Sequence, residues 1–172
     1  MKPNSKYKIE FAGLKIGTHQ FNFKVDKKFF ESFSFSDFND VSVNIDIDLT
    51  KKSTLLELNF ILEGRVNVNC DLTNEPFEHL IKHEAALVVK FGHEFNNEDD
   101  EILVLPHGEH KLYVEQYIFE LIVLSLPPKR IHPGVEDGSL KSEILEILED
   151  LKPKENSNLA DPRWEQLKKF KK

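Results

Sequence analysis

The sequence predicts an α+β protein with a mostly antiparallel sheet or partial β-barrel, one buried helix and two C-terminal helices. Apolar and polar residues alternate through much of residues 7–105, which is typical of strands with one polar face. An almost uniformly apolar run at 115–126 indicates a buried helix. Beyond Gly134, apolar residues recur at helical spacing, which indicates a further, amphipathic helix.

The clearest strand covers residues 41–49, where apolar and polar residues alternate without a fault. The same period occurs at 21–25 and at 56–62, is interrupted by Gly64, and resumes at 66–70. Asp, Thr, Asn and Pro between Asp71 and Pro76 then favour a turn, and a further strand follows at 77–91. We therefore expect a meander of antiparallel strands.

The helix at 115–126, EQYIFELIVLSL, can become extended near its end and must stop at Pro127 and Pro128. Farther on, apolar residues recur at helical spacing from Leu140 to Leu151, with Ser139 placed as an N-cap. We expect residues 1–151 to form a single α+β domain. Residues 152–160 are predicted to be a flexible linker, and residues 161–172 a C-terminal amphipathic basic helix.

Composition limits the function classes. A formal net charge of −7 counts against a protein that coats nucleic acid by phosphate neutralisation alone. No secretory signal or membrane-length apolar run is present, and one cysteine cannot form an internal disulfide, so we expect a cytoplasmic protein. The acidic run at 96–101 favours a solvated loop over a cation site.

Cys70 could be a nucleophile, a metal ligand or a buried hydrophobe. No cysteine-hydrolase motif surrounds it. Because Cys70 follows Val66 and Val68 at intervals of two residues, it would share their apolar strand face, which favours the buried hydrophobe. Gly13 and Gly17 lack the remainder of a phosphate-binding loop and favour a hairpin or strand connection. The sequence therefore predicts no catalytic residue.

Two pairs of histidines are weak metal candidates. His79 and His83 would lie on one side of a helix or a strand, so two ligands could converge, but a third ligand and the zincin pattern are missing. Solvent-facing histidines are the favoured interpretation, and a metal-dependent enzyme is a remote alternative. His107 and His110, in PHGEH, are a weaker pair within a predicted turn.

Basic residues cluster at Lys129 and Arg130 and again in the last twelve residues. The second cluster, mixed with Trp164 and Phe170, could combine phosphate attraction with base stacking. Alternatively, the tail docks its apolar side on the domain or on a protein partner and leaves its lysines in water. The net negative charge favours this alternative, because it gives no long-range attraction toward RNA.

Three phrases in order resemble the bacterial YceD family, also called large ribosomal RNA subunit accumulation proteins. They are GRVNVNCDLTNEPF, EQYIFELIVLSLPPKRIHP and DPRWEQLKKFKK, and the resemblance covers roughly Leu62 to the C-terminus. The family motif residues, which we expect to be structural, are Gly64, Cys70, Pro76, Phe77, Leu126, Pro127, Asp161 and Pro162.

The resemblance implies a non-enzymatic, cytoplasmic factor that supports accumulation or processing of 23S large-subunit ribosomal RNA and ribosome assembly. Its expected partner is that RNA or its precursor, or else a large-subunit ribosomal protein; a module that binds an assembly factor is the alternative. No cofactor or membrane is implied. The residues expected to bind RNA or a partner are Lys129, Arg130, His132, Arg163, Trp164, Lys168, Lys169, Lys171 and Lys172.

The chain departs from the family pattern at two cysteines. Thr73 stands where the family has the second cysteine of Cys-x-x-Cys, and a further cysteine expected near Val135 is missing. Of four soft ligands only Cys70 and His132 would remain, so we predict that this chain holds no metal. The turn should instead be held by packing and by Asp71, Thr73 and Asn74 bonding to local backbone.

Overall fold

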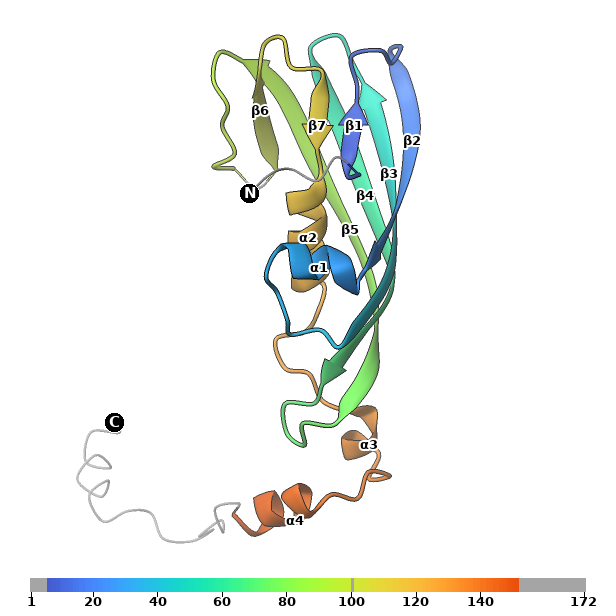
Figure 1. Cartoon of the computed structure of the whole chain (residues 1–172), viewed down its shortest axis with the longest axis vertical. Coiled ribbons are helices and arrows are strands. Elements are labelled where there is room, and N and C mark those ends of the chain that lie inside the picture. The colour runs from blue at the N-terminus through green and yellow to red at the C-terminus, as the bar shows by residue number, and fades with distance from the viewer. Residues whose placement is uncertain (1–5, 100, 152–172) are drawn as a thin grey trace, which may run out of the picture.

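The computed structural model describes residues 6–99 and 101–151. Its main layer is a curved sheet of five strands in the order β2-β3-β4-β5-β6 (Figure 1). The strands are β2 (Gly17–Asp26), β3 (Asp40–Lys51), β4 (Leu55–Asn69), β5 (Pro76–Gly92) and β6 (Ile102–Pro106). Neighbours from β2 to β5 are antiparallel, and β6 is parallel to β5. This confirms the α+β class with a mostly antiparallel sheet, which does not close into a barrel.

A smaller layer covers one face of the sheet. Its elements are β1 (Lys8–Glu10), α1 (Lys27–Ser32), β7 (Lys111–Tyr113) and α2 (Glu115–Leu124), with β1 and β7 paired antiparallel. Figure 1 shows these elements on the same side of the curved sheet. Two further helices, α3 (Pro133–Glu136) and α4 (Glu143–Asp150), lie at the end of the sheet where β4 turns into β5.

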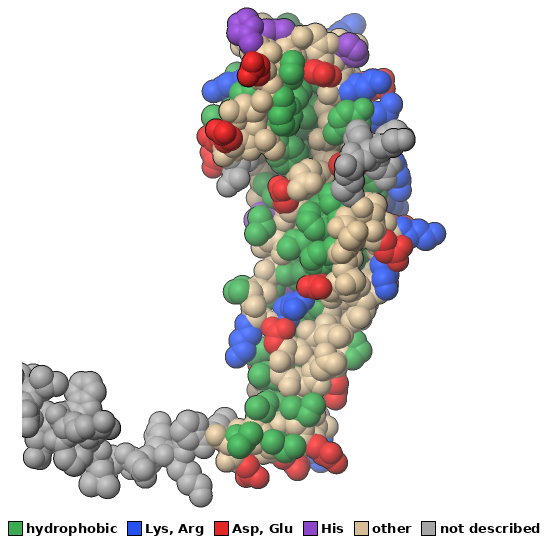
Figure 2. All heavy atoms as spheres, turned by 60° about the vertical axis from the view of Figure 1, so that its left-hand side comes forward, with side chains coloured by type: hydrophobic (Ala, Val, Ile, Leu, Met, Phe, Trp, Pro, Cys, Tyr) green, Lys and Arg blue, Asp and Glu red, His purple; other side chains and the backbone are tan. Residues whose placement is uncertain are grey.

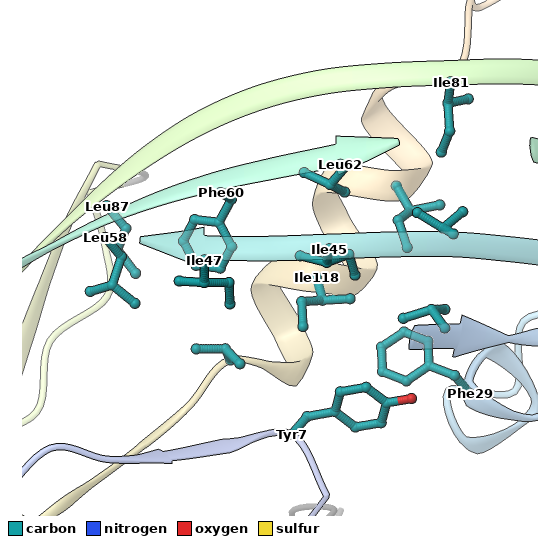
Figure 3. Close-up of a cluster of buried hydrophobic side chains, with 14 of the residues drawn as sticks. Tyr7, Phe29, Ile45, Ile47, Leu58, Phe60, Leu62, Ile81, Leu87 and Ile118 are labelled. Atoms are coloured by element: carbon teal, nitrogen blue, oxygen red, sulfur yellow. The ribbon is translucent and has the colours of Figure 1, made fainter. Parts of the chain in front are cut away.

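The core lies between these layers and follows the predicted alternation. Ile45 of β3 and Phe60 of β4 are at most 1% exposed and face Ile118 of α2 (Figure 3). Phenylalanines of α1 and the loop after it surround Phe119, and the rings of Phe33 and Phe119 stack at 4.4 Å. Aromatic packing thus fastens α2 over the sheet.

Strand β4 differs from the prediction at Gly64. The expected interruption there is wrong, because β4 runs through Gly64 and pairs it with Val43 of β3. A Cβ atom at position 64 would lie 2.4 Å from the Ser42 carbonyl oxygen and 2.6 Å from the Val43 Cα. Glycine is therefore required for the close approach of β3 to β4.

Helix α2 is buried on one side only. Ile118 and Ile122 are fully buried, whereas Leu124 is 74% exposed. The nearly uniform apolar sequence therefore has two uses: one face enters the core, and the other stays at the surface. The helix ends at Leu124, two residues before the predicted limit.

Helix α4 confirms a helix in this region but not its predicted start. It begins at Glu143 after Ser142, whereas the backbone amide of Ser139 donates to the Asp137 carboxylate at 2.8 Å. The prediction of Ser139 as N-cap is therefore wrong. None of the residues of α4 is buried. Within residues 6–99 and 101–151, no helix is long and apolar enough to cross a bilayer.

Candidate functional site

The turn between β4 and β5 contains Cys70, one of the predicted motif residues. The Cys70 amide donates to the Glu75 carbonyl and the Asn74 amide to the Cys70 carbonyl, both at 2.8 Å. Asn74 has φ +58, a left-handed conformation that asparagine tolerates better than most residues. The Glu75 amide donates to the Thr73 hydroxyl at 3.4 Å. The predicted turn and the local backbone bonding of Thr73 are confirmed.

Asp71 bonds to a distant segment, so its predicted local role is wrong. The Arg130 backbone amide donates to the Asp71 carboxylate at 2.6 Å, and the Arg130 guanidinium lies 3.5 Å from the other carboxylate oxygen. In return, the Asp71 amide donates to the Arg130 carbonyl at 2.8 Å. Asp71 therefore ties the turn to the segment that follows α2.

His132 extends the same connection. Its backbone amide donates to the Cys70 sulfur at 3.3 Å, and its ring meets the Phe77 ring edge-on at 5.4 Å. Its Nδ1 accepts from the Gly134 amide at 2.9 Å, so the side chain caps the short helix α3. We call Cys70, Asp71, Phe77, Arg130 and His132 the base clasp.

Cys70 is 2% exposed, in agreement with the buried-hydrophobe prediction. Burial raises the pKa of its thiol, but hydrogen bonds from the Thr73 hydroxyl and from the amides of His132, Thr73 and Leu72 outweigh this effect. The net pKa lies below the ordinary value, because each bond favours the thiolate. Thr73, where the family pattern has a cysteine, thus interacts with the Cys70 sulfur through a hydroxyl.

The donors of the base clasp do not fit a four-ligand zinc site. They supply one thiol, one imidazole and one carboxylate, and both His132 Nδ1 and the Asp71 carboxylate already accept hydrogen bonds. In the described part of the chain, no three His, Cys, Asp or Glu side chains are grouped to hold a metal ion. Elemental analysis of the purified protein tests the prediction that it holds none.

The proposed convergence of His79 and His83 is wrong. Both residues lie in β5 with the same parity, and four strand residues span about 13 Å, too far for two ligands of one ion. Both side chains are half-buried, so they are not fully solvent-facing. His107 and His110 occupy the predicted turn, and His107 instead lies beside His93, with ring centroids 5.7 Å apart.

The remaining predicted site residues are dispersed or lie outside the described residues. Lys129 and Pro127 are exposed, and Leu126 is half-buried against the core. The basic tail was the main predicted contact region. The predicted contact residues of the tail and two motif residues lie outside the described part of the chain: Asp161, Pro162, Arg163, Trp164, Lys168, Lys169, Lys171 and Lys172.

Sequence reasoning missed a groove of about 780 Å³ between α2 and the edge of the sheet. Its apolar lining includes Leu87 and Leu103 from the sheet and Leu121 from α2, with Phe95 and Leu124 exposed around it. Figure 2 shows hydrophobic side chains in a band along this face, with acidic side chains beside them. We call this feature the α2 groove. Its only sequence signal was the second apolar face of α2.

Together, the curved sheet, the base clasp and the α2 groove define an α+β protein whose apolar groove lies between α2 and the sheet. No match was found among curated proteins or among solved structures. One family model, described as "Large ribosomal RNA subunit accumulation protein YceD", matches residues 58–171. This is more than half of the chain, so the chain belongs to the YceD family, as the three sequence phrases predicted.

The family match begins inside β4, so β1, β2 and most of the β3 to β4 hairpin precede it. Nevertheless, β3 pairs with β4 over twelve residues. The matched part therefore shares its sheet with the part before it. The family name connects the chain with accumulation of the large ribosomal RNA subunit.

Proposed function

We propose that the protein is a non-enzymatic cytoplasmic factor that supports accumulation or processing of 23S ribosomal RNA by binding the RNA or its precursor through residues 161–172. The observation that supports this proposal is the difference in charge between the C-terminal part of the chain and the rest. Residues 152–172 contain seven Lys or Arg and three Asp or Glu. Residues 1–151 contain sixteen Lys or Arg and twenty-seven Asp or Glu. Only the C-terminal part has the sign that attracts phosphates.

The tail also contains the residue types that bind single-stranded RNA. Trp164 and Phe170 stand among Arg163, Lys168 and Lys171, so base stacking can accompany phosphate contacts. The predicted roles of Arg130 and His132 as direct RNA contacts receive less support, because both residues are engaged in the base clasp. We assign them to holding the shape of this end of the molecule, with Lys129 beside them facing solvent.

The test is co-sedimentation with large-subunit precursors. One variant replaces all five tail cations with glutamine: Arg163, Lys168, Lys169, Lys171 and Lys172. A matched control replaces five exposed body lysines with glutamine: Lys15, Lys24, Lys27, Lys28 and Lys90. We expect the tail variant to lose co-sedimentation and the control to keep it. Unchanged co-sedimentation of the tail variant contradicts the proposal.

The α2 groove favours a second candidate function, a module that binds a ribosomal protein or assembly factor. An apolar groove with exposed leucine and phenylalanine at its edges is typical of protein recognition. RNase treatment of a pull-down separates the candidates, since protein contacts survive it. The ribosome profile of a deletion strain tests both, and a normal large-subunit peak contradicts both.

A further inference from the structure

The α2 groove leaves large apolar side chains in contact with water. Leu124 is 74% exposed, Phe95 58% and Tyr113 40%, and all three line the groove. Exposed apolar surface is costly in proportion to its area, and a contiguous exposed apolar patch marks an interaction site. An occupant that covers these side chains is therefore stabilised by burial.

The charges around the groove restrict what that occupant can be. Asp99, Glu109 and Glu120 are among its lining residues, and Lys111 is the one cation in that set. The Asp99 loop also carries Glu98 and Glu101, which are exposed. The groove therefore selects a segment that combines apolar anchors with positive charge.

We propose that the α2 groove is the docking site for residues 161–172 of the same chain. Within this segment Trp164, Leu167 and Phe170 recur every three residues, a spacing that brings them to one side of a helix. The segment has five Lys or Arg against two Asp or Glu, opposite in sign to the groove. Its apolar anchors fill the groove, and its lysines lie toward the acidic edge.

Residues 152–160 tether this segment to the described part of the chain, and nine fully extended residues span about 30 Å. Tethering also gives the tail an effective concentration in the millimolar range, which favours it over a free partner of equal affinity.

Docking would hold Trp164 away from other ligands. A partner that needs the Trp164 ring, including a stacked base, would first have to displace the tail from the groove. The proposed contact lies within one chain and requires no RNA. Its test can therefore be separated from that of the proposed function.

Trp164 is the only tryptophan, so its fluorescence reports this contact directly. The experiment uses the full chain without RNA and measures the emission maximum and acrylamide quenching. A synthetic peptide of residues 152–172 gives the values for an exposed tryptophan. We expect the protein to emit at shorter wavelength than the peptide and to be quenched several-fold less.

A groove variant, Phe95→Lys with Leu124→Lys, removes two exposed apolar contacts and adds repulsion toward the tail. The matched control, Ile16→Lys with Leu80→Lys, changes side chains that are 72% and 78% exposed and do not line the groove. We expect the groove variant to emit and to be quenched like the peptide, whereas the control keeps the values of the native chain.

Three results would overturn the proposal. The first is peptide-like emission in the native chain, and the second is shielded emission that the groove variant leaves unchanged. The third is emission that depends on protein concentration, which would place the tail on a second copy. Ile147→Lys on α4 gives a further control. If this variant loses the shielding of Trp164 and the groove variant keeps it, the tail lies on α4. A result that contradicts docking in the groove does not contradict the proposal that the tail binds RNA.

Discussion

Gly64 shows how one residue without a side chain supports the sheet. Gly64→Ala would place a Cβ atom 2.4 Å from the Ser42 carbonyl oxygen, so two paired strands must separate. We expect the free energy of unfolding to fall by about 1–3 kcal/mol, as for other overpacked sites, in urea denaturation. Gly13→Ala is the control, since a Cβ there meets nothing within 4 Å. Equal effects of the two substitutions would contradict this account.

Cys70 should make the free energy of unfolding depend on pH. Its net pKa in the folded protein is lowered, so the folded state releases the thiol proton at lower pH than the unfolded state. The native chain therefore gains stability as pH rises through the folded pKa, and the gain is complete above the unfolded value of about 8.5.

The comparison is between the native chain and Cys70→Ala, by urea unfolding at about pH 6 and about pH 9.5, on either side of the ordinary thiol pKa. We expect the native chain to be more stable than the variant by a margin that is larger at the higher pH. A margin that does not change with pH would show that folding leaves the thiol pKa unshifted, and a margin that shrinks at the higher pH would show that folding raises it.

At the scale of elements, the base clasp joins the β4 to β5 turn to the segment after α2. Asp71 accepts hydrogen bonds from both the amide and the guanidinium of Arg130, whereas Arg130→Ala leaves the amide bond in place. Asp71→Ala should therefore lower the free energy of unfolding by about 1–2 kcal/mol and Arg130→Ala by about 0.2–1 kcal/mol. Urea denaturation measures both, and the reverse order would contradict the assignment.

The sequence predicted most of these elements from local patterns. Alternation located β2, β3 and β4, a largely apolar run located β5, and the turn residues located Asp71–Pro76, because side-chain pattern and turn chemistry are properties of neighbouring residues. The histidine pair shows the limit of this reasoning. A spacing of four places His79 and His83 on one side of a helix or a strand, but only the helix brings them close together.

At the scale of the whole molecule, the acidic body and the basic tail should determine how RNA association responds to salt. If five tail cations each neutralise one phosphate of single-stranded RNA, the logarithm of the binding constant falls with the logarithm of salt concentration with a slope of about −3.5. Filter binding at increasing salt measures this slope. The glutamine variant of the tail should show a nearly flat response, and a slope equal to that of the native chain would contradict the assignment.

The candidate site was only partly accessible from the sequence. Family resemblance selected Cys70, Phe77 and His132, and the structure brings all three together. The bonds between Asp71 and Arg130 join residues 59 apart, a pairing that no local pattern reports. The α2 groove escaped notice because a uniformly apolar helix does not reveal which of its faces enters the core.

The sequence by itself determined which faces of the strands are apolar, where the chain turns, how charge is divided between body and tail, and the family of the protein. These properties follow from residue types and their local spacing. Tertiary structure alone decided that β6 runs parallel to β5, that the base clasp closes and that one face of α2 remains as the wall of a groove. The reason is physical: contacts between distant segments depend on burial and hydrogen bonding summed over the whole fold.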